Sequence, residues 1–156
     1  DYLRIVNNIK KLVPKIAFSS DFIVGYPGET DSDFEQTLDL VEKVGFASSY
    51  SFKFSARPGT PASTKENLVS ESTASLRLLK LQNLLNKQQK DFNTSFIDET
   101  VDVLISSKGK KINQYVGRTP YLQPVHVFSK KNLIGDILKI KIQRLTSFSF
   151  HGKILN

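Results

Sequence analysis

The sequence of 156 residues contains no cysteine, no methionine and no tryptophan. Without cysteine the chain has no disulfide, no thiolate nucleophile and no thiolate ligand for zinc or an iron–sulfur cluster. Its two histidines, His126 and His151, are too few for most metal sites unless carboxylates join them. We therefore predict neither a catalytic residue nor a metal site within this chain.

The missing methionine extends to the first position, which is Asp1, so we expect a fragment or a processed product of a longer protein. Long hydrophobic runs are also absent, since none approaches the ~18 residues that span a bilayer. The first thirty residues include acidic side chains and no signal-peptide hydrophobic region. We expect a cytoplasmic protein without a membrane partner.

Glycine and proline are missing between Pro61 and Gly109, which predicts that this stretch is mostly one long helix. Charge is also unevenly distributed along the chain. Residues 1–96 carry 12 basic and 11 acidic side chains, whereas residues 97–156 carry 10 basic and 4 acidic ones. A nearly neutral part of net charge +1 is therefore followed by a basic part of net charge +6.

The first part of the chain shows alternating helix and strand signals. Apolar residues at helical spacing predict a helix over residues 2–12, which Pro14 ends. A strand is expected over residues 16–24, because its final Phe-Ile-Val is apolar on both faces, as in a buried parallel strand.

A second helix and a second strand follow. Thr30 and Asp33 form a capping-box pattern, and Gly45 ends the helix that they begin. The second strand is expected over residues 48–54. Because two strands cannot close a sheet, we expect its other members to be missing from this chain, and an exposed sheet edge to promote self-association.

The long helix is expected to begin at a Ser70 cap and to run to about Phe96. Its buried face would comprise Leu78, Leu81, Leu85, Phe92 and Phe96. The solvated face would carry Arg77, Lys80, Lys87 and Lys90.

Five short segments with β-type patterns follow Thr100, separated by Gly, Pro, Asn or Ser: 101–106, 113–119, 124–128, 137–145 and 147–155. Five strands in about 60 residues favour a small OB-like barrel, since closure removes the sheet edges. The predicted fold class is thus α/β plus all-β.

The sequence SDFIVGYPGET, at residues 20–30, places a glycine-rich turn directly after a buried strand and before a helix. In α/β proteins ligands bind at such turns, because backbone N–H groups and the helix dipole converge there. The turn matches neither a Walker A loop nor GxGxxG. A structural turn and a ligand-contacting turn both remain open on the residues alone.

The basic part of the chain suits an RNA-contacting barrel, because its cations can bind phosphates while aromatic rings stack on unpaired bases. The candidate phosphate contacts are Lys110, Lys111, Arg118, Lys130, Lys131, Lys139, Lys141, Arg144 and Lys153. The candidate stacking rings are Tyr115, Tyr121, His126 and Phe128. The alternative is that these charges only solubilise the domain.

Two pairs of segments resemble one known family. SDFIVGYPGETDSDFEQTLDLVEKVGF and FKFSARPGTPAS resemble the last βα units of the radical S-adenosylmethionine (SAM) domain of the MiaB-type tRNA methylthiotransferases. YVGRTPYLQPVHV and LIGDILKIKI resemble the TRAM domain of the same family. The resemblance implies the end of a partial (β/α) barrel over residues 1–66, a connecting helix over 67–96 and a TRAM barrel over 97–156.

The resemblance implies that the parent enzyme adds a methylthio group to a modified adenosine beside the tRNA anticodon. The main reading of that substrate is N6-isopentenyladenosine, and threonylcarbamoyladenosine is an alternative. The cofactors implied are SAM and two 4Fe-4S clusters, whose ligands lie upstream in the family. Two further alternatives are a stand-alone TRAM RNA-binding module and the remnant of a split gene.

The resemblance also implies site residues. Ile23 and Gly25 would line the adenine side of the SAM pocket, with the turn Pro27–Glu29 just beyond it. Phe54 and Arg57 would lie near the pocket at the end of the second strand. Glu29 has capping of the next helix as its alternative role, and Arg57 has a loop salt bridge. The implied partners are the anticodon stem-loop of tRNA and the missing N-terminal half.

Overall fold

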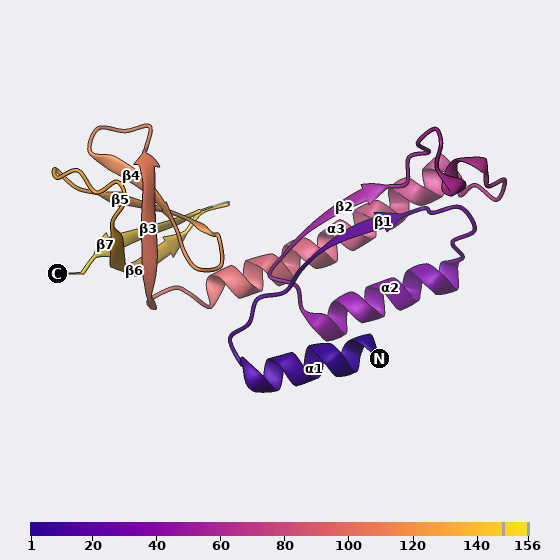
Figure 1. The fold of residues 1–156 in the computed structure, drawn as a ribbon, viewed down its shortest axis with the longest axis horizontal. Coiled ribbons are helices and arrows are strands. Elements are labelled where there is room, and N and C mark those ends of the chain that lie inside the picture. The colour runs from indigo at the N-terminus through magenta and orange to yellow at the C-terminus, as the bar shows by residue number, and fades with distance from the viewer. Residues whose placement is uncertain (148, 156) are drawn as a thin grey trace. The chain divides into compact units, whose positions relative to one another are not determined.

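The computed structural model describes residues 1–147 and 149–155. The chain divides into two compact units, residues 1–90 and residues 91–156, each of which appears in Figure 1. The first unit contains α1 (Tyr2–Leu12), β1 (Ser19–Val24), α2 (Asp31–Val44), β2 (Ser48–Lys53), a 3-10 helix (Pro61–Thr64) and most of α3 (Glu71–Thr94). The second contains β3 (Thr100–Lys108), β4 (Gln114–Arg118), β5 (Pro124–Phe128), β6 (Ile137–Leu145) and β7 (Phe150–Ile154).

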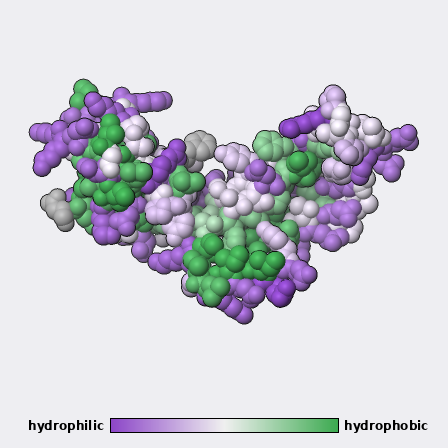
Figure 2. Space-filling model, in the orientation of Figure 1, coloured by the Kyte–Doolittle hydropathy of each residue, from purple (hydrophilic) through white to green (hydrophobic). Residues whose placement is uncertain are grey.

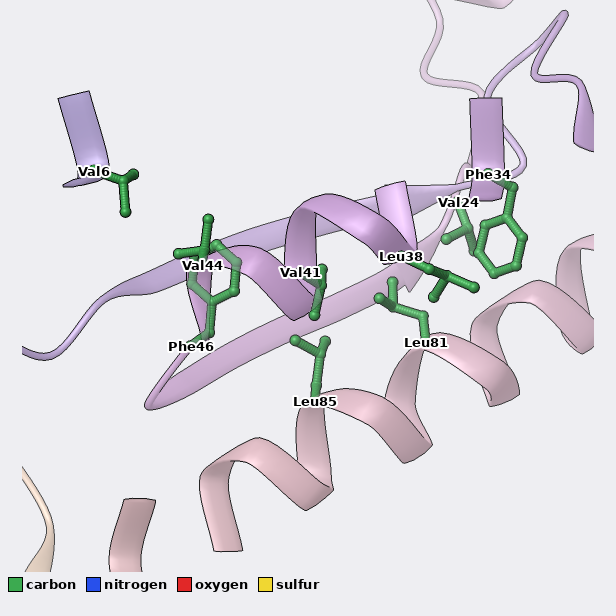
Figure 3. Packing of buried hydrophobic residues seen from close by; sticks show 9 residues of the cluster. All are labelled: Val6, Val24, Phe34, Leu38, Val41, Val44, Phe46, Leu81 and Leu85. Carbon is green, nitrogen blue, oxygen red and sulfur yellow. The ribbon is translucent and has the colours of Figure 1, made fainter. Parts of the chain in front are cut away.

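The first unit contains a two-stranded parallel sheet, β1–β2, and helices that contribute to one hydrophobic cluster with it. Figure 3 shows how side chains from α2 and α3 point toward one another within it. The buried members are Val6, Val24, Phe34, Leu38, Val41, Val44, Phe46, Leu81 and Leu85. The expected α/β arrangement of this unit is confirmed.

Strand β1 differs from the expectation in its start and in its burial. It begins at Ser19 rather than Ile16, because the Ile16 N–H donates to the Val13 carbonyl at 3.0 Å in a turn around Pro14. Val24 is fully buried, but Ile23 is 58% exposed. The described part of the chain therefore covers only one face of this strand.

The helix caps follow the sequence signals. Thr30 accepts a hydrogen bond from the Asp33 N–H, the Asp33 side chain accepts from the Thr30 N–H, and Gly45 ends α2 in a left-handed conformation with φ 68°. At the start of α3, the Ser70 hydroxyl accepts from the Thr73 N–H at 3.1 Å. Both predicted helix starts are confirmed.

The prediction that Arg77 is solvated is wrong. Arg77 is only 6% exposed and lies in one stripe of α3 with Ala74, Leu81 and Leu85. These positions recur at helical spacing, so the periodicity itself places Arg77 on the buried face. Its charge favours exposure, but the ion pairs of its guanidinium with Glu29 and Asp31 make burial of that charge tolerable.

The second unit is a closed barrel with strand order β3-β4-β5-β7-β6, in which β6 pairs again with β3. Its β5–β7 pair is parallel and its other pairs are antiparallel. The buried core consists of Val103, Ile105, Tyr115, Val125, Val127, Leu133, Ile140, Ile142 and Phe150. The five-stranded OB-like barrel expected from the sequence is confirmed.

Close strand approach in this barrel depends on glycine. A Cβ at Gly152 would lie 2.3 Å from Ile140 Cγ2 and 2.8 Å from the Lys141 carbonyl oxygen. A Cβ at Gly117 would lie 2.6 Å from the Leu104 carbonyl oxygen. Hydrophilic side chains extend from the visible surface of this unit, with apolar ones among them (Figure 2).

Candidate functional site

The turn after β1 is held in a conformation that glycine adopts most readily. Gly25 has φ 72° and Gly28 has φ 89°, both in the left-handed region. The Gly28 N–H donates to the Asn67 carbonyl at 2.7 Å, and the Glu29 N–H donates to the Tyr26 carbonyl at 2.8 Å. The chain therefore leaves β1 through a hydrogen-bonded turn tied to the segment before α3.

Gly25 is required for space as well as for conformation. A Cβ on this residue would lie 2.8 Å from the Cβ of Ala74, which is in the first turns of α3. A larger side chain would push α3 away from the end of β1. The start of α3 thus packs directly on the turn.

The Glu29 carboxylate accepts hydrogen bonds that hold the turn together. Its Oε2 accepts from the Gly25 N–H at 2.8 Å and from Arg77 Nη1 at 2.7 Å. The side chains of Glu29 and Arg77 are only 11% and 7% exposed. A charge-assisted bond between two such shielded groups fixes the turn against α3.

Arg77 also connects the turn to α2. Its Nη1 donates to the Glu29 carbonyl at 3.1 Å, its Nη2 donates to Asp31 Oδ1 at 2.6 Å, and its guanidinium lies 5.6 Å from the Phe34 ring centre. The hydrogen bond to Asp31 raises the pKa of Arg77, with Glu29 adding to the effect against the opposing cost of burial. One guanidinium therefore fixes the turn relative to both flanking helices.

An apolar surface lies on the sheet face that the helices leave open. Ile23 and Phe52 are paired in register and are 58% and 54% exposed, and Tyr50 is 71% exposed. The rings of Tyr50 and Phe52 are stacked with centroids 6.5 Å apart. We call Ile23, Tyr50 and Phe52 the open sheet face. It ends beside the Gly25 turn, because Gly25 directly follows β1.

The structure joins Gly25 and Glu29 of the proposed SAM pocket by a hydrogen bond, whereas the other proposed residues have different surroundings. Ile23 belongs to the open sheet face, Gly25 and Pro27 are buried in the turn, and Glu29 is engaged by Arg77. The cofactor roles of these four residues remain predictions.

The other two proposed pocket residues follow β2. Phe54 is half-buried, with its ring 5.3 Å from that of Tyr26 in an edge-to-face contact. Arg57 is exposed, and its carbonyl accepts from the N–H and hydroxyl of Thr60. Their cofactor roles also remain predictions, whereas sequence reasoning overlooked Tyr50 and Phe52, whose alternation with the inward positions of β2 was the available signal.

The basic residues of the barrel fall into two groups. Lys139 pairs with Asp102 at 2.9 Å and Lys141 with Asp98 at 3.5 Å, so part of their charge is neutralised. The β3–β4 loop and the β5–β6 connection carry four exposed lysines, Lys110, Lys111, Lys130 and Lys131. Among the described residues, no carboxylate forms an ion pair with any of them. These four, with the exposed Arg144, are the stronger candidates for phosphate contacts.

Arg118, another proposed phosphate contact, is exposed, but its Nη1 already donates to the Leu122 carbonyl at 2.9 Å. Lys153 is exposed near the end of β7. Neither observation tests RNA contact.

The proposed stacking rings differ in availability. Tyr115 is only 7% exposed and belongs to the barrel core, so its proposed role as a stacking platform is wrong. It pairs in register with the inward-facing Val127, which explains its burial. Tyr121 contacts the rings of Phe92 and Phe96 edge-on, at 5.6 and 5.3 Å. Its RNA role remains a prediction.

Two proposed rings lie on the outside of the barrel. Phe128 is 54% exposed at the end of β5. His126, between the buried Val125 and Val127, is half-buried and stacks on His151. The outer surface of β5 therefore presents an aromatic and an imidazole ring.

Within residues 1–147 and 149–155, no group of three or more histidine, aspartate and glutamate side chains is arranged to hold a metal ion. Among the helices of these residues, none has the length and apolar character needed to cross a membrane.

Comparison with known proteins gives two matches. Residues 95–155 match the family model described as the TRAM domain. Over 154 residues, 97% of its length, the chain is 47% identical to the tRNA-2-methylthio-N(6)-dimethylallyladenosine synthase of Wolbachia pipientis wMel. The chain spans only 35% of the length of that relative.

Proposed function

We propose that this chain forms part of a MiaB-type tRNA methylthiotransferase. It contains a TRAM domain and is similar over nearly its whole length to such an enzyme. In this proposal it supplies one wall of the SAM pocket and the barrel that holds tRNA. The substrate class is a tRNA that carries N6-dimethylallyladenosine beside the anticodon. The similarity over 97% of the chain is the observation that carries the proposal, because it includes both units.

The residues of the first unit fit a cofactor wall. The open sheet face offers apolar side chains that an adenine ring can contact, and the adjoining turn offers backbone groups held rigid by Glu29 and Arg77. SAM and the iron–sulfur clusters of the family supply the methylthiolation chemistry. The share of this chain is to orient the cofactor and exclude water from it, which contributes to rate through positioning.

The chain has no cysteine and therefore supplies no thiolate ligand to a cluster. We propose that the missing N-terminal half of the enzyme provides those ligands, and that this chain alone is inactive. Anaerobic reconstitution with iron and sulfide, followed by visible absorbance and a methylthiolation assay, tests this. A stoichiometric cluster on the isolated chain would contradict it.

The barrel would bind the anticodon arm mainly through charge. If four to six lysines and arginines contact phosphates, the slope of log K against log salt is expected to be about −3 to −4, using ~0.7 per contact for a single strand. The probe is a fluorescently labelled anticodon stem-loop titrated with the chain at several salt concentrations.

Paired variants test which lysines carry this interaction. Substitution of Lys110 and Lys111 by Ala removes two phosphate contacts, and is expected to flatten the slope by about one to two units. Substitution of Lys139 and Lys141 is the matched control, because Asp102 and Asp98 already pair with these lysines. An equal effect of both pairs would show that binding is diffuse, and absence of binding at low salt would refute the RNA role of the barrel.

A further inference from the structure

Two histidines form a stacked pair on the outside of the barrel. His126 of β5 and His151 of β7 are partners in the parallel register, with ring centroids 5.1 Å apart and planes inclined by 26°. Val125, Val127 and Phe150 point inward from the same strands, so the alternation of a β-strand turns both imidazoles outward. These are the only histidines in the sequence.

The surroundings of the pair are positive. Arg144 of β6 is the register partner of His151, and Lys111 comes from the β3–β4 loop. The register partner of His126 on β4 is the uncharged Val116. In the described residues no carboxylate pairs with either imidazole.

Burial, followed by the charges of Arg144, His126 and Lys111, lowers the pKa of His151 below its ordinary value of 6.5. The free protein thus disfavours a proton on His151, because burial and then the nearby cations both oppose the charged imidazole.

One nitrogen of the pair is unsatisfied. Nδ1 of His126 is buried and has no hydrogen-bond partner among the described residues. Such an atom carries a desolvation penalty that a ligand can relieve. Rotation of the ring about its Cβ–Cγ bond would turn this nitrogen toward an approaching acceptor.

We propose that His126 and His151, with Lys111 and Arg144, form a proton-coupled site for an RNA backbone phosphate. A phosphate oxygen would accept hydrogen bonds from a protonated imidazole and from the flanking cations. The inference deepens the proposed RNA-binding function of the barrel and rests on it. It adds an imidazole pair to the lysines and arginines, and the charge of His151 makes the interaction depend on pH.

The direction of the pH dependence follows from the charges. The negative charge of a bound phosphate would attract a proton on His151 and offset the repulsion from the neighbouring cations. The pKa of His151 is therefore expected to rise on binding. RNA affinity is therefore expected to increase as the pH falls, by up to about tenfold per pH unit for each proton taken up. The increase begins below the pKa of the bound form and ends below that of the free form.

Nuclear magnetic resonance of the imidazole C–H protons tests this directly on the full chain, since only two histidines contribute signals. The probe is an anticodon stem-loop RNA at saturating concentration and low salt. We expect the pKa of His151 to rise when the RNA is added. Unchanged titration in the presence of bound RNA would overturn the inference while leaving RNA binding intact.

Substitutions provide an independent readout. H126Q and H151Q are expected to remove most of the pH dependence of affinity between pH 5 and pH 7. The control K130A/K131A is expected to weaken binding at every pH and to keep the pH dependence. An unaltered pH dependence in both histidine variants would contradict the site.

Two arms of the experiment separate other outcomes. Inorganic phosphate alone, at millimolar concentration, is expected to leave the titration of His151 unchanged, and a full shift would show a general anion site rather than an RNA site. If the stem-loop fails to bind at any pH, the proposed RNA function itself fails. Binding without the pKa rise refutes only the histidine site.

Discussion

The two units of this chain differ in how completely they pair their strands and cover the apolar faces of their sheets. The barrel pairs each of its strands on both sides and buries one core inside. The first unit has two strands, covers one sheet face with helices and leaves Ile23, Tyr50 and Phe52 on the other. A closed sheet can place its binding groups outside, whereas an open sheet offers its uncovered face as the binding surface.

The largest expected effect tests whether each unit has its own core. Replacement of Phe150, which is 1% exposed in the barrel, by Ala is expected to cost about 3–5 kcal/mol of barrel stability. Hydrogen exchange is the measurement, and amides of β3–β7 should lose protection while those of α2 do not. Equal loss in both units would mean that they unfold as one.

The next effect concerns the ion pair between Glu29 and Arg77, which holds the Gly25 turn against α3. R77L leaves the shielded Glu29 carboxylate without its cation, and is expected to cost about 3 kcal/mol in the first unit. Urea unfolding followed by circular dichroism measures this cost. The control K80L is on the same helix as Arg77; it removes an exposed pair with Glu35 of α2 and is expected to cost less than about 1 kcal/mol.

A double variant distinguishes the loss of the Glu29–Arg77 ion pair from the loss of side-chain packing by Arg77. R77L/E29L removes both charges and is expected to recover part of the lost stability, because the unpaired carboxylate is gone. Recovery is incomplete since Glu29 also accepts the Gly25 N–H. If the double variant is no more stable than R77L, the carboxylate is not the source of the penalty.

A smaller effect is expected on association. Because the open sheet face is apolar and β1 has a free edge in the described sheet, we expect the isolated chain to self-associate there. F52S is expected to weaken association about tenfold, the equivalent of roughly 1.4 kcal/mol of lost burial. Sedimentation velocity measures this, with L76S on the exposed side of α3 as control. An equal effect of both variants would place the interface elsewhere.

The smallest effect concerns the α2 cap. T30A is expected to cost about 1 kcal/mol at neutral pH, as is usual for an N-cap threonine. Hydrogen bonds from the Thr30 side chain and backbone lower the pKa of Asp33. Because the folded pKa is lowered, this contribution is present above the unfolded value of 3.8 and is lost as the pH falls through the folded value. Thermal unfolding of T30A and the natural chain should therefore differ less in acid, and the remaining difference should come from the Asp33 N–H, which donates to the Thr30 hydroxyl at any pH.

The sequence predicted the elements of both units because their signals are local. The capping box at Thr30 and Asp33, the Ser70 cap and the period-two pattern after Thr100 each specify their own segment. The aromatic ring of Tyr115 suggests a stacking role, whereas its place in the alternation of β4, opposite the inward-facing Val127, predicts that it is buried. Local pattern carried more information than residue type.

The site was less predictable because its contacts join distant parts of the chain. Glu29 and Arg77 are 48 positions apart, and only the fold shows that their side chains form an ion pair. His126 and His151 meet through the parallel β5–β7 register, which no short motif encodes. Candidate residues can be chosen from sequence, but their mutual contacts require the topology.

The central claim is that the barrel, and not the first unit, carries the RNA-binding surface. The most direct measurement is amide chemical-shift mapping of the full chain during titration with an anticodon stem-loop at low salt. The account predicts that the shifts concentrate at the β3–β4 loop around Lys111, at His126, and at Arg144 and His151, with residues 1–90 nearly unchanged. Shifts centred on Ile23 and Phe52, or none at saturating RNA, would contradict it.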